Sequence, residues 1–178
     1  AAQPGHAGPP TGAPGMKRHF TVTAFVSAEQ RTLLHWHRKN RMWLPPGGHI
    51  EPDEDPYQAA LREAEEEIGF PVVLLPTVTP YKYSQPRQLP PPVTIMVEDI
   101  PATPSEPEHQ HLDLIYFARP QDANPPTPVD GTWRWVSSEA LRDNHALAPS
   151  NDMQPITMPE DVRVLGMAAI QRAAEEAL

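Results

Sequence analysis

The chain has 178 residues and a formal net charge of −9, which indicates one domain of ordinary size with room for a hydrophobic core. The acidic balance argues against a groove that binds duplex nucleic acid through cationic side chains, although a bound metal could still attract a small phosphorylated molecule. The sequence contains no cysteine and no apolar run of membrane-spanning length, which excludes disulfides, thiolate metal sites, cysteine nucleophiles and a membrane helix.

The first fifteen residues contain no aliphatic side chain larger than alanine, so they cannot bury enough surface to offset the entropy of ordering. We expect residues 1–15 to be a disordered leader, Met16 to be the natural start, and residues 16–178 to form a single domain. The leader lacks the basic and apolar regions of a secretory signal, and we expect a cytoplasmic protein.

Short runs of apolar and β-branched residues predict strands along most of the chain. The strands are expected at residues 20–26, 31–37, 72–75, 93–97, 112–119 and 132–136. Between them lie a basic loop at 38–41 and proline-rich loops at 76–92, 98–108 and 120–128. A short helix is expected after Ser137, and a capping-box pattern at 157–160 predicts a final helix. This order predicts an α/β fold, with a mixed sheet and helices packed on its faces.

The helix between Asp55 and Gly69 is predicted by signals at both ends. Asp55 followed by Pro56 is typical of a helix start, and Gly69 can supply the left-handed residue after the last turn. One side carries an apolar stripe about 100° wide, as expected for a face that packs on a core. This stripe consists of Tyr57, Ala60, Leu61, Ala64 and Ile68.

Glu63, Glu66 and Glu67 share a different arc of the same helix, because residues three and four apart are neighbours on its surface. Like charges at this spacing destabilise a helix, and a bound divalent cation would reverse that effect. Hard cations such as Mg²⁺ take oxygen ligands and share them with substrate phosphates. A solvated acidic face is the alternative interpretation. We expect the preceding Gly47-Gly48 to form a tight turn that lets the backbone approach a ligand.

The spacing of these residues follows a known motif. The chain has Gly48, five residues, Glu54, seven residues, Arg62-Glu63, two residues, Glu66-Glu67, one residue and Gly69-Phe70. This pattern resembles the signature of the Nudix (MutT-like) hydrolases, with Ala64 standing where the family more often has a larger aliphatic residue. The resemblance implies an α/β/α sandwich with a mixed sheet and a loop–helix–loop catalytic motif. It also implies a hydrolase that uses metal-activated water to cleave a pyrophosphate bond in a nucleoside diphosphate linked to another moiety.

The resemblance assigns roles to the motif residues. Arg62 would orient the glutamates, and Glu54 would pair with that arginine. The ligands of Mg²⁺, with Mn²⁺ as a possible substitute, would be the carbonyl of Gly48 and the carboxylates of Glu63, Glu66 and Glu67. The partner expected from this resemblance is a small-molecule diphosphate, and a homodimer is possible because dimers are common in the family.

Other side chains are candidates for the general base or for substrate contacts. The carboxylates considered as a base outside the helix are Glu98, Asp99, Glu106, Glu108, Asp113 and Glu139. His109, His111 and Asp113 alternate, so they share a face if this stretch is extended, either as a metal or substrate site or as a solvated strand end. His49 and Arg41 are further candidates for phosphate contacts. The aromatic residues that could stack on a base are Trp36, Trp43, Tyr81 and Tyr83.

Two other classes of function are alternatives to a hydrolase. A non-catalytic Nudix module that binds a nucleotide-like effector would generally have lost motif glutamates, whereas the motif here is intact. An isopentenyl-diphosphate-type isomerase uses a cysteine, and this chain has none. The substrate stays open among dinucleoside polyphosphates, ADP-ribose, nucleoside triphosphates and non-nucleotide diphosphates.

Overall fold

The computed structural model describes residues 15–122, 127–128 and 131–176. The leader predicted at residues 1–15 lies outside the described residues except for Gly15, and part of the loop predicted at 120–128 lies outside them as well. No helix in the described part of the chain is long and apolar enough to cross a membrane.

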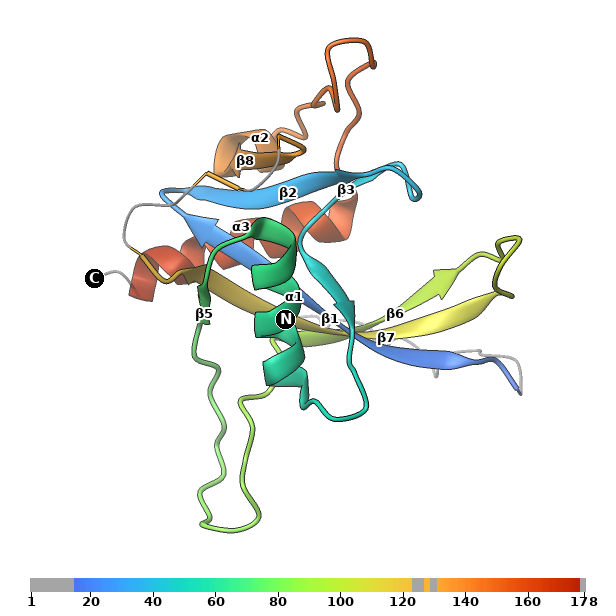
Figure 1. The fold of residues 1–178 in the computed structure, drawn as a ribbon. Helices are drawn as coiled ribbons and strands as arrows, with labels where there is room; N and C mark the ends of the chain where they lie inside the picture. Colours follow the sequence, from blue (N-terminus) through green and yellow to red (C-terminus); the bar gives the residue numbers. More distant parts are fainter. Residues whose placement is uncertain (1–14, 123–126, 129–130, 177–178) are drawn as a thin grey trace, which may run out of the picture.

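Among the described residues, eight strands form one mixed sheet around β1 and β7 (Figure 1). The strands are β1 (Arg18–Ala28), β2 (Arg31–His37), β3 (Met42–Leu44), β4 (Gly47–His49), β5 (Val72–Leu74), β6 (Thr94–Ile100), β7 (His109–Pro120) and β8 (Trp133–Ser137). The order along the sheet is β3-β2-β1-β7-β5, while β4 pairs with β1, β6 with β7 and β8 with β2. β1 and β7 run parallel, and the remaining pairs of described strands are antiparallel.

Two helices cover opposite faces of this sheet, α1 (Pro56–Ile68) in front and α3 (Glu160–Glu176) behind it in Figure 1. Val22 and Ala24 of β1 belong to the core under α1, whereas Phe25 of the same strand belongs to the core under α3. Alternate residues of a strand point to opposite faces, so one strand serves both cores. A short helix, α2 (Ser138–Arg142), lies between β8 and α3 in the chain. The α/β/α sandwich implied by the motif is confirmed.

The ends of α1 follow the sequence prediction. The Asp55 side chain accepts the backbone N–H of Gln58 at 2.9 Å, and the Gln58 side chain accepts the backbone N–H of Asp55 at 3.0 Å. Gly69 has a φ of 81°, and its N–H donates to the carbonyl of Glu65. The apolar face is slightly broader than the predicted stripe, because Ala59 is buried as well.

Two short strands, β3 and β4, were not predicted, and β4 replaces the tight turn expected at Gly47-Gly48. Gly47 pairs with Thr23 of β1, and a Cβ on Gly47 would overlap the carbonyl oxygen of Val22. Glycine is therefore needed here for close approach of two strands, and the turn prediction was wrong. The strand is short and contains two glycines, so it carries no periodic apolar signal.

Two long strands extend beyond their predicted bounds. β6 continues to Ile100, inside the loop predicted at residues 98–108, and β7 begins at His109, three residues before the strand predicted at 112–119. The extra residues pair with each other, with Glu98 opposite His111 and Ile100 opposite His109. This pairing places Glu98 and His109 on the sheet. At the other end of the chain, α3 begins at Glu160, a few residues later than the capping pattern predicted.

Candidate active site

Arg62 of α1 is the centre of an ionic network beside β4. Its guanidinium donates to the two oxygens of Glu54 at 2.5 and 2.9 Å and to the backbone carbonyl of His49 at 3.1 Å. The same group donates to Glu63 at 2.8 Å and to Glu66 at 3.3 Å. Hydrogen bonding to Arg62 holds the pKa of Glu54 below its usual value. The network therefore ties the segment before α1 and the end of β4 to the acidic side of the helix.

The two glycines of β4 lie directly against helix glutamates. A Cβ on Gly48 would overlap the carboxylate of Glu63, so only glycine lets this carboxylate lie on the strand backbone. The backbone N–H of Gly47 donates to Oε2 of Glu67 at 3.3 Å. The signature glycine and the signature glutamates thus contact each other in space as well as sharing a sequence pattern.

The three glutamates occupy different surroundings. Arg62 contacts Glu63 and Glu66, with the Glu66 side chain largely exposed, whereas Glu67 is held at the backbone of Gly47. Among the described residues, two groups of side chains bring potential metal-ligand atoms within 4.8 Å of one another. Neither group contains any of these three glutamates. Burial, together with the charges of Glu63 and Glu66, raises the pKa of Glu67 to about 7 against the opposing hydrogen bond from Gly47. The three carboxylates are close enough for their negative charges to repel one another, but their oxygen atoms do not gather around one point.

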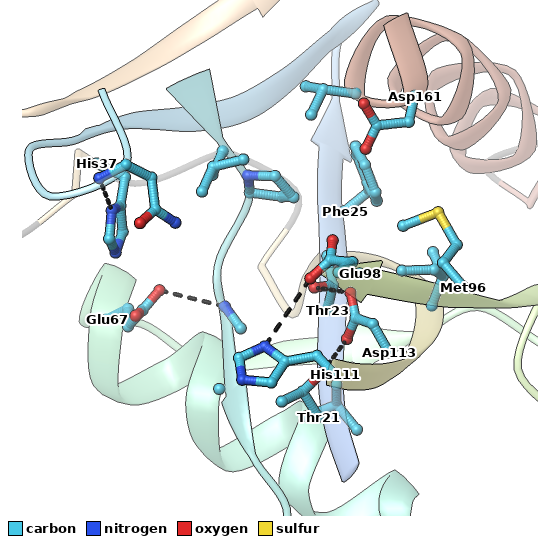
Figure 2. Close-up of a pocket in the computed structure, with 18 of the residues that line it drawn as sticks. Thr21, Thr23, Phe25, His37, Glu67, Met96, Glu98, His111, Asp113 and Asp161 are labelled. Carbon is cyan, nitrogen blue, oxygen red and sulfur yellow. Dashed lines mark hydrogen bonds and ion pairs between the residues drawn. The ribbon is translucent and has the colours of Figure 1, made fainter. Parts of the chain in front are cut away.

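A cavity of about 180 Å³ is lined by residues from both helices, including Glu67 of α1 and Asp161 of α3 (Figure 2). Its lining comes from both helices and from strands on either side of β1. The ionisable side chains in its lining include Glu67, Glu98, His111, Asp113 and Asp161. Phe25 and Met96 contribute apolar surface. This site combines several carboxylates with a polar backbone segment at β4, an arrangement suited to a charged ligand that brings cations with it.

Asp113 of β7 is held rigidly in this cavity. It accepts hydrogen bonds from the hydroxyls of Thr21 at 2.9 Å and Thr23 at 2.8 Å, and all three residues appear together in Figure 2. The parallel register places Thr21 directly opposite Asp113. Burial raises the pKa of Asp113, while the two threonine hydroxyls lower it. Both oxygens of this carboxylate are therefore engaged by β1.

Glu98 of β6 is the second carboxylate outside α1 that was predicted as a base and lines the cavity. Burial, together with the charges of Asp113 and Asp161, raises its pKa to about 7. The other predicted bases do not line the cavity: Asp99 accepts a hydrogen bond from Gln110, Glu106 pairs with Lys17, and Glu108 and Glu139 are exposed.

Asp161 was not among the sequence candidates. It stands in the first turn of α3, where an acid is common because it interacts favourably with the helix dipole. Its position therefore carried no signal of a site. Only the packing of α3 behind the sheet brings Asp161 to the cavity.

The predicted substrate contacts are only partly brought together. His49, His111 and Asp113 line the cavity, and His109 lies next to His111 without lining it. Arg41, an exposed residue after β2, does not line the cavity, although Asn40 beside it does. Burial, together with the charges of the neighbouring histidines, lowers the pKa of His111 to about 4.

The four aromatic candidates for base stacking do not line the cavity. Trp43 is fully buried, and Trp36 is 9% exposed, so both serve the core. Tyr81 and Tyr83 are exposed in the proline-rich connection between β5 and β6. A stacking role for either tryptophan is therefore excluded in this structure.

Comparison with known proteins identifies the class. The chain matches the NUDIX domain family over residues 17–154. It belongs to the Nudix family. A solved Nudix-family hydrolase from Clostridium perfringens has 28% sequence identity and a TM-score of 0.63, over 88% of this chain and 98% of that one.

Two curated relatives are 30% identical to this chain. One is an isopentenyl-diphosphate Delta-isomerase of Streptomyces griseus, matched over 145 residues that cover 77% of this chain and 66% of that protein. The other is a probable DHNTP pyrophosphohydrolase of Lactococcus lactis, matched over 100 residues that cover 55% of this chain and 52% of that protein. The chain thus spans less than two thirds of the length of these relatives, and their names cover two different reactions.

Proposed function

We propose that this protein is a Mg²⁺-dependent Nudix pyrophosphohydrolase that cleaves a phosphoanhydride bond in a nucleoside diphosphate linked to another moiety. The observation that carries the proposal is the contact between β4 and α1, where Glu63 lies against Gly48 and Glu67 is bound by Gly47. This contact joins the motif carboxylates to a cavity with further carboxylates, including Glu98.

We propose that the metal is held by the carbonyl of Gly48 and the carboxylates of Glu63, Glu66 and Glu67. All four donors are oxygens, which suits Mg²⁺ and also Mn²⁺. The raised pKa of Glu67 supports this assignment, because burial beside two other carboxylates is a strain that a cation relieves. When bound, the metal neutralises charge on the phosphoryl oxygens and lowers the pKa of the attacking water.

The chain's own residues have separate tasks in this proposal. Arg62 positions Glu63 and Glu66 through direct hydrogen bonds, and Glu54 fixes Arg62 from the other side. Glu98 is the proposed general base, because it lines the cavity and Asp113 is already engaged by two threonines. Glu98 would take the proton of the water whose oxygen bonds to phosphorus, while the bridging oxygen leaves with one phosphoryl product.

An isomerase and an effector-binding module are the competing functions. The similarity to an isopentenyl-diphosphate isomerase favours an isomerase. That isomerisation would need a catalytic cysteine, and this chain has none. A binding module would not need a full set of motif glutamates around Arg62. The hydrolase uses all of these residues, so it accounts for more of the structure than either competitor.

A panel of phosphorylated substrates, with and without Mg²⁺, tests the proposal. The panel contains dinucleoside polyphosphates, ADP-ribose, nucleoside triphosphates, dihydroneopterin triphosphate and isopentenyl diphosphate, with product identification by mass spectrometry. We expect Mg²⁺-dependent release of phosphorylated products and a rate loss on the order of 100-fold or more in Glu66→Gln and Glu67→Gln, since each loses one charged ligand. Glu65→Gln, on the exposed side of the same helix, is the matched control and should keep the wild-type rate.

Wild-type rates in both Glu66→Gln and Glu67→Gln would refute the hydrolase mechanism. Conversion of isopentenyl diphosphate to its isomer would favour the isomerase, and tight nucleotide binding without turnover would favour the binding module. A homodimer, a cytoplasmic location and a phosphate contact by Arg41 stay predictions. Light scattering of the purified protein tests the first of these.

A further inference from the structure

Four histidines from three strands meet at one end of the parallel β1–β7 pair. His19 comes from β1, His49 ends β4, and His109 and His111 begin β7. The register sets His19 opposite His111, and it sets His49 opposite Thr21, two residues after His19. Ring centroids are 4.8 Å apart for His19 and His109 and 5.1 Å apart for His49 and His111. These segments are distant in the sequence, so the cluster is a product of the fold.

The spacing of the ring nitrogens matches that of ligands around one metal ion. Nδ1 of His19 is 3.2 Å from Nε2 of His49, and Nε2 of His109 is 3.3 Å from Nε2 of His111. Zinc–nitrogen bonds of about 2.0–2.1 Å in a tetrahedron place neighbouring nitrogens about 3.3–3.4 Å apart. One ligand atom each from His19, His49 and His111 lies within 4.8 Å of the other two, and His19 and His109 form a second set of this kind with Glu106. Both measured separations are close to an edge of that tetrahedron.

His109 is held in the orientation that ligation requires. Its Nδ1 lies 3.0 Å from the carbonyl oxygen of Pro107, which can only accept, so this nitrogen carries the proton. The Nε2 lone pair then points toward His111. Metal-bound histidines commonly donate their other nitrogen to a carbonyl in this way. His109 is only 5% exposed, which contradicts the alternative of a solvated strand end.

The strand ends that carry the cluster are fixed by a separate polar contact. The Gln110 side chain, between the two β7 histidines, donates to Asp99 of β6 at 2.8 Å and accepts from Arg18 of β1 at 2.9 Å. These bonds join β1, β6 and β7 next to His19. The ligand set is therefore built on paired strands, which hold its side chains in place.

We propose that His19, His49 and His111 form a Zn²⁺ site separate from the oxygen ligands on α1, with His109 beside His111 as the fourth ligand. Imidazole nitrogens suit zinc and similar transition metals, whereas Mg²⁺ prefers oxygen, so the two sites select different ions. Glu106, whose carboxylate is 4.0 Å from Nε2 of His109, stands at the edge of the cluster. Zinc at this position cross-links the start of β1, the end of β4 and the start of β7. The proposal does not depend on the hydrolase activity.

Zinc binding to the full chain in millimolar Mg²⁺ tests this site, with a chromogenic chelator as competitor. We expect one equivalent of Zn²⁺ in the wild-type protein. The His19→Ala/His111→Ala double variant should bind at least about 100-fold more weakly, since loss of an orienting partner alone costs 10- to 100-fold. His145→Ala, an exposed histidine beyond α2, is the matched control and should bind like the wild type. Glu67→Gln should also keep the zinc equivalent, which separates this site from the one on α1.

X-ray absorption of the zinc-loaded protein should show imidazole nitrogens at about 2.0–2.1 Å. Thermal melting in EDTA checks that the double variant folds. If it does not fold, the single variant His49→Ala, at an exposed position, replaces it in the zinc titration. Equal zinc affinity in the wild type and a folded histidine variant would refute the site. An all-oxygen ligand shell, or loss of the zinc equivalent in Glu67→Gln, would refute it as well.

Discussion

Glu67→Gln should stabilise the metal-free protein while it removes activity. The folded protein holds the Glu67 carboxylate in a buried position beside two other carboxylates, and this raises its pKa from 4.5 to about 7. A group whose pKa is raised by folding contributes most stability below its unfolded pKa, and that contribution is lost as the pH rises to the folded pKa. The charged Glu67 is therefore a cost to the folded state above about pH 7, and glutamine removes the charge at nearly constant volume.

The size of the effect follows from the two pKa values. A tenfold change in a proton equilibrium is about 1.4 kcal/mol, so the difference between 4.5 and about 7 limits the cost to about 3 kcal/mol. Partial exposure of the side chain screens this interaction, and we expect about 1–2 kcal/mol. For a chain of this length, that free energy corresponds to a rise in Tm of about 2–8 °C.

The assay is thermal unfolding of wild type and Glu67→Gln in EDTA between pH 4 and pH 8. The variant should melt higher at pH 8, and the difference should fade as the pH drops to about 4.5, where the wild-type carboxyl is protonated. Glu65→Gln, exposed on the same helix, should show no such difference. Added Mg²⁺ should raise the Tm of the wild type more than that of Glu67→Gln. A variant that is less stable than the wild type at pH 8 in EDTA would refute the reasoning.

Three further variants test other parts of the site and the fold. Gly48→Ala forces the Glu63 carboxylate off β4, and we expect a loss of kcat on the order of 100-fold with far-UV circular dichroism unchanged; a normal rate would contradict the proposed contact. Glu98→Gln should lower kcat by about 10²–10⁴-fold, whereas Glu139→Gln, away from the cavity, should not; equal rates would exclude Glu98 as the base. Asp55→Ala should cost about 1 kcal/mol of unfolding free energy and Asp55→Asn much less, because asparagine keeps the cap acceptor. The backbone N–H of Gln58 holds the pKa of Asp55 below its ordinary value of 3.8. The loss of unfolding free energy in the alanine variant should therefore be present above pH 4 and shrink at lower pH. A loss that does not change with pH would contradict this origin.

The sequence predicted best where the signals are local. The start of α1 at Asp55 and its end at Gly69 depend on residues within one turn of each cap, and both were predicted correctly. The Nudix motif is also local, because it is confined to one loop and one helix. Most strands were recognised for the same reason, since each carries its own apolar pattern. A class of protein could therefore be assigned before any tertiary contact was known.

Features that depend on strand pairing could not be predicted. β4 has only three residues and no apolar pattern, so its pairing with β1 is visible only in three dimensions. The alternation of His109 and His111 is visible in the sequence, but nothing there joins these residues to His19, which lies about 90 positions earlier. Thr21 and Thr23 were missed as partners of Asp113 for the same reason.

One register between β1 and β7 places the core, the carboxylate site and the histidine cluster together. It sets Val22 opposite Leu114 on the side of α1, and Thr21 opposite Asp113 on the other side. It also sets His19 opposite His111. Since side chains alternate along a strand, a slip of one residue would turn every one of these groups to the wrong face. The apolar packing that stabilises the register therefore also keeps the polar groups in place. This explains how the ends of three strands can hold four histidines without a separate hydrophobic core.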